Sequence, residues 1–360
     1  MTTARNTFSE SSDGVTEGRK REHIETILKS DVVAKGVTTG FEQFTFEHCG
    51  MPEIDLDGID LTTTVFGKLL QAPILISSMT GGVDHGATIN RRLAECAQEL
   101  GLAMGLGSQR AGIEQSSLEK TYKVRDVAPD ILLFANLGAV QLNYGYGVDE
   151  ARRAVEMIEA NALFIHLNPL QEAVQPEGDR NWSGILKKLE NLISRLDVPV
   201  VVKEIGAGLS GDLVRKLLAI GVSAVDVAGA GGTSWSEVEA ERQTDKLIRK
   251  VAHSFAGWGI PTAYSLIDAR REAGSIPVFA SGGLRTGIDI AKAIRFGASL
   301  CGVAAPALGP ADRDTETAMD HLKSLIEELR ITAFCTGSGS MKDLAKAPIR
   351  RVNDWSIVEF

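Results

Sequence analysis

Residues 72–82 read APILISSMTGG, and this stretch decides the fold. Its first half is a continuous apolar run, which is typical of a parallel strand covered on both faces. Its second half changes to hydroxyl residues and ends in Gly81 and Gly82. In strand–helix proteins the chemistry lies at the carboxyl ends of the strands, where glycine lets backbone amides approach a ligand closely. The stretch therefore predicts one wall of a binding site at a strand end.

The same pattern recurs along the chain. Apolar runs alternate with helical periodicity, and several helical stretches end at a glycine. The predicted strands are residues 74–79, 103–108, 131–137, 162–168, 198–204, 223–229, 276–281 and 299–305. The predicted helices are residues 87–100, 115–127, 149–160, 183–196, 210–220, 262–273 and 286–296. Eight such strands favour an α/β fold of the closed TIM (β/α)8 barrel type. An open doubly wound sheet is the alternative, and polar residues after almost every strand weaken it, because that fold gathers them at one switch point.

Extensions are expected at both ends of this barrel. The chain has 360 residues, more than a barrel of about 250 residues needs. We expect a disordered tail over residues 1–18, an N-terminal lid or extension over 19–71, the barrel over 72–312, and a C-terminal helix and tail over 313–360. Within these parts, 19–29 has the spacing of an amphipathic helix, Phe41, Phe44 and Phe46 alternate as in a strand, 230–261 is an insert at the barrel mouth, and 315–334 is helical.

Composition excludes some classes of protein. The net charge of −9 argues against nucleic-acid binding, so an anionic ligand must meet a local cluster of cations. No apolar run approaches the roughly 18 residues of a membrane span. The four cysteines lie far apart, which predicts buried, reduced thiols in a cytoplasmic protein.

Polar residues and glycines follow the predicted strands. Alone, each such residue is usually a turn or cap residue, but together they lie at one end of the barrel. Residues 281–287, SGGLRTG, precede a helix and suit a phosphate, because glycine amides, the helix N-terminus and Arg285 supply positive potential. Lys203 follows a run of valines, and a buried lysine needs an anion: either Glu204 or an anionic cofactor atom. A Schiff-base lysine is the competing interpretation.

A second cluster lies at residues 166–172, HLNPLQE. His166 lacks a companion at zinc-ligand spacing. Glu172 beside the amides of Asn168 and Gln171 suits Mg²⁺, which binds one or two carboxylates together with water and substrate phosphate.

Together these segments resemble the type 2, FMN-dependent isopentenyl-diphosphate isomerase family. The resemblance runs in order over nearly the whole chain from residue 19. It is carried by RKREH at 19–23, MTGG at 79–82, GSQR at 107–110, NLG at 136–138, HLNPLQE at 166–172, VKE at 202–204, GGTSW at 231–235, SGG at 281–283 and AA at 304–305.

The resemblance implies the interconversion of isopentenyl and dimethylallyl diphosphate by an allylic 1,3-proton shift. It implies reduced FMN as acid and base, NADPH as a reductant, Mg²⁺ on the diphosphate, and a homo-oligomer (tetramer or octamer). Catalytic roles would fall to Gln171, Lys203 and Glu239, and Mg²⁺ to Glu172. Substrate would contact Arg19, Lys20, His23, Ser108, Gln109, Arg110, His166, Asn168, Gln171 and Trp235. FMN would contact Ser78, Met79, Thr80, Gly81, Ser108, Asn136, Lys203, Thr233, Gly282, Gly283, Arg285, Ala304 and Ala305.

One position departs from the family pattern, and two other functions stay open. Ala228 stands where the family often has serine, so one hydrogen bond to the flavin phosphate is absent, a loss of about 1 kcal/mol. An FMN-dependent oxidoreductase of the hydroxy-acid oxidase kind would use a similar barrel. A non-catalytic flavin-binding protein is the other alternative, but it would not need the groups at 166–172.

Overall fold

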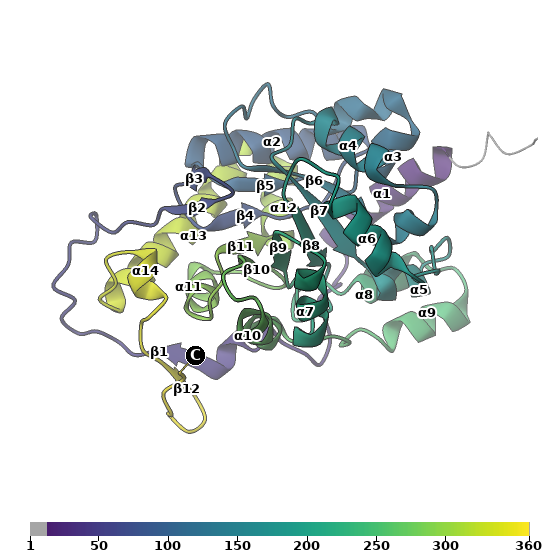
Figure 1. The fold of residues 1–360 in the computed structure, drawn as a ribbon. Coiled ribbons are helices and arrows are strands. Elements are labelled where there is room, and N and C mark those ends of the chain that lie inside the picture. The colour runs from purple at the N-terminus through teal and green to yellow at the C-terminus, as the bar shows by residue number, and fades with distance from the viewer. Residues whose placement is uncertain (1–12, 360) are drawn as a thin grey trace, which may run out of the picture.

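A closed barrel of eight parallel strands forms the centre of the molecule (Figure 1). The structure is a computed structural model that describes residues 13–359, so most of the predicted tail lies outside the described residues. The barrel strands, in chain order, are β4 (Ile74–Ile76), β5 (Ala103–Gly105), β6 (Leu133–Gly138), β7 (Ala162–Leu167), β8 (Val200–Glu204), β9 (Ala224–Asp226), β10 (Val278–Ala280) and β11 (Leu300–Val303). β4 pairs with β11 and closes the barrel. The predicted fold class and all eight strands are confirmed.

Several strands end earlier than predicted. β4 stops at Ile76, whereas the apolar run suggested an end at residue 79. The backbone of Ser77 still donates to Val303, but from Ser78 onward the chain turns away and lines a cavity. The last residues of the apolar run therefore lie at the rim of the barrel and are not part of its hydrogen-bonded strands.

Aromatic side chains fill the barrel interior. The rings of Phe134 and Phe164 stack with centroids 4.3 Å apart. A hairpin of β2 (Thr63–Val65) and β3 (Lys68–Leu70) lies at the amino end of the strands. Its tip residue Phe66 has φ of 49° and contacts Phe134 edge-on with centroids 6.3 Å apart. Because this end is sealed by packed rings, space for a ligand lies at the carboxyl end.

Helices surround the barrel close to their predicted bounds, with one exception. They are α2 (Asp84–Leu100), α4 (Val148–Met157), α6 (Ile185–Ile193), α7 (Gly211–Ala219), α10 (Thr262–Glu272) and α11 (Gly287–Arg295). The single helix expected over 115–127 is wrong: the chain forms α3 (Arg110–Glu114) and a 3-10 helix at Ser116–Tyr122. Gln115 is extended and separates these two elements, and Lys123 is extended directly after the 3-10 helix. Tyr122 is fully buried, where it packs against Gly81.

The N-terminal extension and the C-terminal tail meet on one side of the barrel (Figure 1). A 3-10 turn at Phe41–Gln43 replaces the start of the expected strand, and β1 (Phe44–Phe46) pairs antiparallel with β12 (Ile349–Arg351). The C-terminal helix is confirmed as α13 (Thr315–Cys335), and it packs on α11, α2 and α12 (Ala305–Arg313). A short helix, α14 (Met341–Leu344), follows it.

Helix α1 (Asp13–Lys29) crosses the carboxyl end of the barrel, and it begins within the segment expected to be a tail. It packs against α2, α12 and α8 (Trp235–Arg242), which lies in the insert together with α9 (Lys246–His253). Directly after α1, Ala34 donates to the Gly232 carbonyl and Ser234 donates to the Val32 carbonyl. The helix is therefore anchored to the insert at its carboxyl end.

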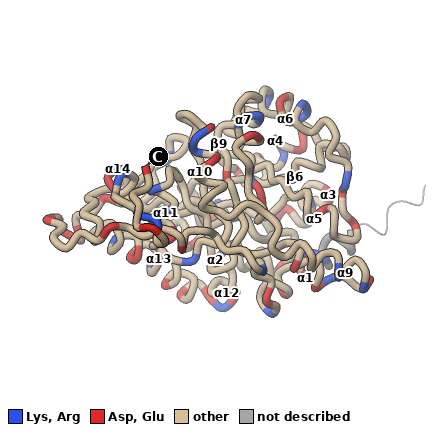
Figure 2. Tube along the Cα trace, turned by 90° about the horizontal axis from the view of Figure 1, so that it is seen from below, with Lys and Arg blue, Asp and Glu red and all other residues tan. Residues whose placement is uncertain are grey.

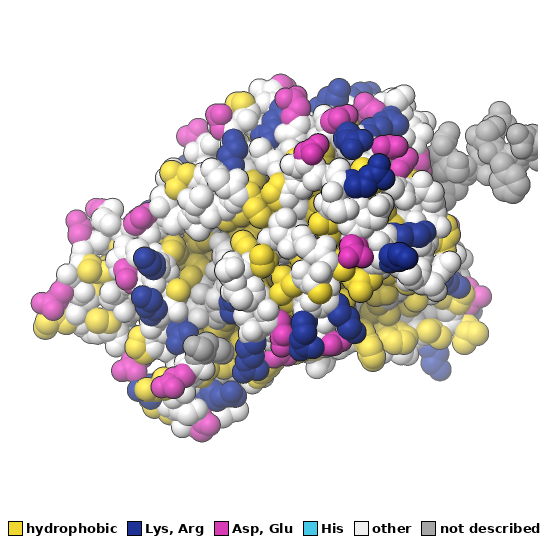
Figure 3. Space-filling view, viewed as in Figure 1, with side chains coloured by type: hydrophobic (Ala, Val, Ile, Leu, Met, Phe, Trp, Pro, Cys, Tyr) yellow, Lys and Arg dark blue, Asp and Glu magenta, His cyan; other side chains and the backbone are white. Residues whose placement is uncertain are grey.

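Acidic and basic residues are mixed along the outer helices (Figure 2). An apolar surface interrupts them on α9 and the loop after it, at the lower right of Figure 3. There Leu247, Val251 and Trp258 are 71%, 44% and 63% exposed. Among residues 13–359, no helix is both long and apolar enough to cross a membrane.

Candidate active site

A cavity of about 460 Å³ opens at the carboxyl end of the barrel. Residues at or just after the carboxyl ends of the barrel strands, residues of α1 and residues of the insert line it. All predicted site residues line this cavity except Gln109 and Glu239. The lining residues are Arg19, Lys20, His23, Ser78, Met79, Thr80, Gly81, Ser108, Arg110, Asn136, His166, Asn168, Gln171, Glu172, Lys203, Thr233, Trp235, Gly282, Gly283, Arg285, Ala304 and Ala305.

Glycines after β9 and β10 bring two loops into backbone contact. Gly282 has φ of 98°, and a Cβ built on it would lie 2.2 Å from the Gly229 carbonyl oxygen. A Cβ on Gly232 would lie 2.5 Å from the Gly283 nitrogen. Behind these loops, Thr286 caps α11 by accepting from the Asp289 backbone amide, and the first amide of that helix, on Gly287, donates to Glu328 Oε2 at 2.6 Å. Such a cradle suits the phosphate of a flavin mononucleotide.

Replacing Gly282 with alanine is expected to abolish tight flavin binding, because the methyl group meets backbone and the positive φ is strained. The measurement is FMN titration by fluorescence quenching. Gly309→Ala is the control, because a Cβ there has no atom within 4 Å. Unchanged affinity in the Gly282 variant would show that the cradle does not hold the phosphate.

Lys203 lies 5% exposed at the end of β8. Its Nζ donates to the Glu204 carbonyl oxygen at 2.6 Å, and no carboxylate of the described residues forms an ion pair with it. The Glu204 carboxylate instead accepts from the amides of Ile205, Gly206 and Ala207 at 2.6, 2.7 and 2.5 Å. Burial raises the pKa of Glu204 to about 7, although these amides oppose the shift. The ammonium of Lys203 therefore suits an anionic cofactor atom in the cavity better than the carboxylate of Glu204.

Two serine hydroxyls beside the flavin cradle lack partners. Ser77 Oγ and Ser78 Oγ are buried, and neither has a hydrogen-bond partner among the described residues. Both residues line the cavity. A buried hydroxyl without a partner is costly, so these atoms fit the polar edge of a bound ring system. Together with the glycine cradle and Lys203, they support an FMN site.

A cluster of cations lies at the other side of the cavity. Lys20 Nζ donates to the Ser108 carbonyl at 2.8 Å and contacts Tyr122 Oη at 2.5 Å. Burial, with Arg19 and Arg110 nearby, lowers the pKa of Lys20 to about 7, although Glu114 opposes this. Arg110 binds Glu114 at 2.7 Å and Asp179 at 2.8 Å. Positive groups held this close together suit a multiply charged anion such as a diphosphate.

Glu172 is a buried carboxylate 5% exposed on α5 (Pro169–Val174). Its oxygens accept from Asn168 Nδ2 at 2.9 Å, Gln175 Nε2 at 2.6 Å and the Asp179 amide at 2.7 Å. Burial raises its pKa. Asn168 Oδ1 has no partner among the described residues. One carboxylate and one free carbonyl oxygen fit Mg²⁺, which completes its shell with water and phosphate.

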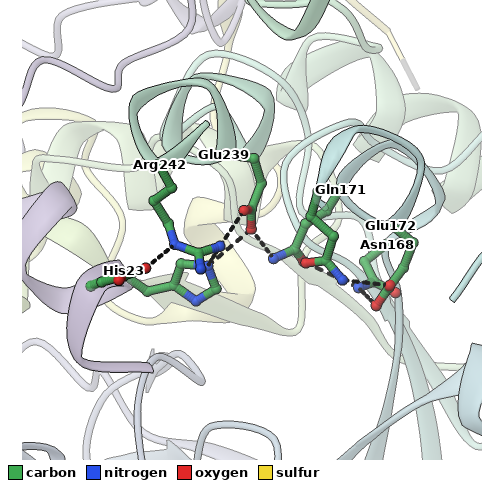
Figure 4. A network of polar contacts seen from close by, with 8 residues as sticks. His23, Asn168, Gln171, Glu172, Glu239 and Arg242 are labelled. Atoms are coloured by element: carbon green, nitrogen blue, oxygen red, sulfur yellow. Dashed lines mark hydrogen bonds and ion pairs between the residues drawn. The ribbon is translucent and has the colours of Figure 1, made fainter. Parts of the chain in front are cut away.

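A hydrogen-bond network connects this region to α1 (Figure 4). Glu239 Oε1 accepts from His23 Nε2 and from Gln171 Nε2, both at 2.9 Å. Gln171 Oε1 accepts from Asn168 Nδ2 at 3.1 Å. The ring of His23 also lies edge-on to Trp235, with centroids 5.2 Å apart. The network therefore holds several of the predicted substrate residues in one arrangement.

His166 is a neutral imidazole in this site. Burial and the charges of Lys203 and Lys20 lower its pKa to about 3. Its Nδ1 donates to Asn136 Oδ1 at 2.7 Å, because the Asn136 amide group already donates to the Leu106 carbonyl. The Nε2 atom of His166 is thereby left as an acceptor.

Two predicted residues lie outside the cavity. Gln109 is fully buried in the wall of the barrel. Its Nε2 donates to the Ala154 carbonyl at 2.8 Å, and its Oε1 accepts from the backbone N–H of Asn136 at 2.9 Å. The polar atoms of Gln109 therefore hold Asn136 in place, and its contact with substrate stays a prediction. Glu239 is also fully buried, behind His23 and Gln171.

Several residues of the site were not predicted, among them Ser77 in the cavity wall and, outside the lining residues, Tyr122 and Arg242. Tyr122 contacts Lys20 and donates to the Ser108 carbonyl at 2.8 Å. No signal in the sequence marks it, since its role depends on the irregular segment after α3. Arg242 binds Glu239 at 2.5 Å. Its position three residues after Glu239 on a helix is the one available signal.

The sequence profile of FMN-dependent dehydrogenases matches residues 158–351. A lactate oxidase structure from Pediococcus acidilactici has a TM-score of 0.67 and 14% identity and covers 97% of both chains. A flavocytochrome b2 variant has a TM-score of 0.66 and 18% identity, covering 90% of this chain and 81% of the other. Fold and profile define an FMN-dependent α/β barrel.

Curated relatives make the assignment more specific. The isopentenyl-diphosphate delta-isomerase of Synechocystis sp. is 58% identical over 93% of this chain and 96% of its own length. That of Cronobacter sakazakii is 53% identical over 93% of this chain and 97% of its own length. The chain belongs to the isopentenyl-diphosphate delta-isomerase family.

Proposed function

We propose that this protein interconverts isopentenyl diphosphate and dimethylallyl diphosphate by an allylic 1,3-proton shift, with FMN and Mg²⁺ as cofactors. The observation that carries the proposal is the composition of one cavity, in which a flavin cradle, a cation cluster and the Glu172 region face each other. The names of the relatives support the same reaction. Reduced FMN, when bound, supplies the acid and the base for carbon.

The substrate has only a diphosphate and an apolar alkene to recognise. Arg19, Lys20 and Arg110 would bind the diphosphate, and Glu172 would hold Mg²⁺ on it. The helix α1 carries Arg19 and Lys20, so substrate binding would fix this helix as a lid. A closed lid excludes water, which a carbocation-like state requires.

Other residues would act on the reacting carbon atoms or on the cofactor. Trp235 would shield positive charge with the face of its ring. Gln171 would assist proton movement, and Glu239 would orient it through their hydrogen bond of 2.9 Å. Lys203 would stabilise negative charge on the reduced cofactor.

The test is an isomerisation assay with isopentenyl diphosphate, FMN, Mg²⁺ and NADPH or dithionite. We expect a flavin spectrum in the purified protein, activity that requires the reductant, and deuterium incorporation from D₂O into the allylic product. Isomerisation without flavin or reductant would contradict the proposal. Oxidation of a hydroxy acid with oxygen as acceptor would support the oxidoreductase alternative instead.

We further propose NADPH as the reductant, a cytoplasmic location and a homo-oligomer. The four cysteines are unpaired, which suits a reducing compartment, although Cys49 and Cys335 are half-buried and not buried as expected. The apolar surface of α9 is of the kind that subunit contacts cover. Light scattering on the holoenzyme tests the oligomer, and a monomer would contradict it.

A further inference from the structure

Arg242 is a nearly buried arginine at the end of α8, outside the residues that line the cavity. Its side chain is 8% exposed. One guanidinium nitrogen, Nη1, binds Glu239 Oε2 at 2.5 Å, and Nε binds Glu22 Oε2 at 2.9 Å. Glu22 belongs to α1, so a single guanidinium connects the insert to the helix above the cavity (Figure 4).

Glu239 divides its two oxygens between the two sides of the network. Oε2 faces Arg242, and Oε1 accepts from His23 Nε2 and Gln171 Nε2. A carboxylate only accepts hydrogen bonds, and His23 Nε2 lies closer to Glu239 Oε1, at 2.9 Å, than to Arg242 Nη1, at 3.3 Å. His23 therefore carries its proton on Nε2, and Gln171 presents its amide nitrogen to Glu239. Both of these side chains line the cavity, whereas Arg242 does not line it and contacts both Glu239 and His23 from behind.

Arg242 is the fixed charge that compensates Glu239. The Glu239 side chain is 0% exposed, and a buried carboxylate requires a cation. Burial, opposed by Glu239 and assisted by Arg242 and Arg19, lowers the pKa of His23, so the imidazole is neutral near pH 7. Burial would raise the pKa of Glu239, but its contacts with His23, Arg242 and Gln171 lower it to about 2.

The charge on Glu239 determines which way the Gln171 amide points. With its nitrogen on Glu239, Gln171 turns its oxygen to Asn168 Nδ2 at 3.1 Å. Asn168 Nδ2 in turn donates to Glu172 at 2.9 Å. A protonated Glu239 would offer a donor to Gln171 and favour the reversed amide, which would set the Gln171 nitrogen against the donor Asn168 Nδ2. The orientation of His23 and Gln171 at the cavity therefore depends on an arginine that does not line it.

We propose that Arg242 is a positioning residue: by binding Glu239 and Glu22 it fixes His23 and Gln171 toward the substrate and holds helix α1 over the cavity. The expected effect of Arg242 on turnover rests on the proposed isomerase function. The charged or titratable groups in or beside the network are Arg242 and Glu239 from α8, Arg19, Glu22 and His23 from α1, and Glu172 from α5.

The experiment compares Arg242→Met and Arg242→Lys with Arg249→Met. Arg249 is the matched control, because it pairs with Glu241 in the same insert but is 45% exposed. The readout that does not need activity is the pKa of the His23 imidazole, followed by NMR on the holoenzyme. We expect this pKa to rise in Arg242→Met, because the repulsion from the guanidinium is lost while Glu239 remains. We also expect kcat to fall about 10- to 100-fold, as for other residues that orient a ligand-contacting side chain. Arg242→Lys should show a smaller change in the His23 pKa and in kcat than Arg242→Met, and Arg249→Met should change neither value.

A double variant separates positioning from simple loss of the lid. In Arg242→Met/Glu239→Gln, the pKa of His23 should fall again, because the carboxylate that raises it is gone while burial remains. An identical, ordinary imidazole pKa in the single and double variants would mean that α1 has left the barrel, and it would overturn the positioning role. An unchanged His23 pKa with unchanged kcat in Arg242→Met would overturn it as well. If instead the unmodified protein fails to isomerise, the proposed function fails, and the His23 titration still decides whether Arg242 orders the network.

Discussion

Replacing Lys203 with methionine is expected to lower isomerase turnover roughly 100- to 1,000-fold, the cost of removing one preorganised charge-stabilising donor, while the barrel still folds. Lys203 is 5% exposed, and among the described residues the hydrogen-bond partner of its ammonium is the Glu204 carbonyl oxygen. A buried cation without a carboxylate does not stabilise the fold, so an apolar side chain of similar length should leave thermal stability equal or higher. The same change should lower the midpoint potential of bound flavin, because a positive charge that favours its reduced form is lost.

The measurements are kcat with prereduced FMN, the melting temperature and a spectroelectrochemical titration. Lys188→Met is the control, since Lys188 also donates to a backbone carbonyl, that of Leu142 at 2.7 Å, but lies on the outer helix α6. Full turnover in the Lys203 variant, or an unchanged potential, would remove Lys203 from the reaction.

Replacing Glu172 with glutamine is expected to weaken the apparent affinity for Mg²⁺ by about 100-fold or more, because one neutral amide replaces a carboxylate ligand. The apparent KM for substrate should rise with it, since the metal would bind the substrate's diphosphate. Activity measured as a function of Mg²⁺ concentration gives both values. The control is Glu177→Gln, which changes an exposed carboxylate in the loop that follows α5. An unaltered Mg²⁺ dependence in the Glu172 variant would place the metal elsewhere.

Glu172 also predicts how Mg²⁺ dependence changes with pH. Burial raises its pKa, and only the ionised carboxylate binds the metal. As pH falls, protons therefore compete with Mg²⁺ at a higher pH than they would at an exposed glutamate. Saturating Mg²⁺ should move the acidic limb of the activity profile to lower pH, and this movement should disappear in Glu172→Gln.

The barrel could be predicted because parallel strands covered on both faces leave continuous apolar runs in the sequence. The ends of the strands could not be predicted, since residues such as Ser78 stay close to the barrel after the hydrogen-bonded strand has ended. The segment 115–127 has helical spacing but forms only a 3-10 helix between the extended residues Gln115 and Lys123, because tertiary packing of Tyr122 prevails over local preference. The pairing of β1 with β12 joins segments some 300 residues apart and leaves no local signal.

The candidate site could be predicted for the residues that follow directly from strand ends, such as Lys203 and Asn136. The direction of each side chain could not be predicted. Gln109 stands next to Ser108 in sequence, yet it turns into the wall while Ser108 lines the cavity. Arg242 was missed because, in the sequence, an arginine near the end of a helix cannot be told apart from an ordinary solvent-exposed arginine.

The pairing of β1 with β12 has a consequence for cotranslational folding. Phe46 lies opposite Ile349, so β1 finds its partner strand only when residues 349–351 have been synthesised. The barrel strands can close earlier, since β11 ends at Val303. A nascent chain halted before residue 349 would thus carry the barrel strands while β1 still lacks its partner strand. The pairing of β1 with β12 would form after the barrel and after the contacts of residues 32–34 with the insert.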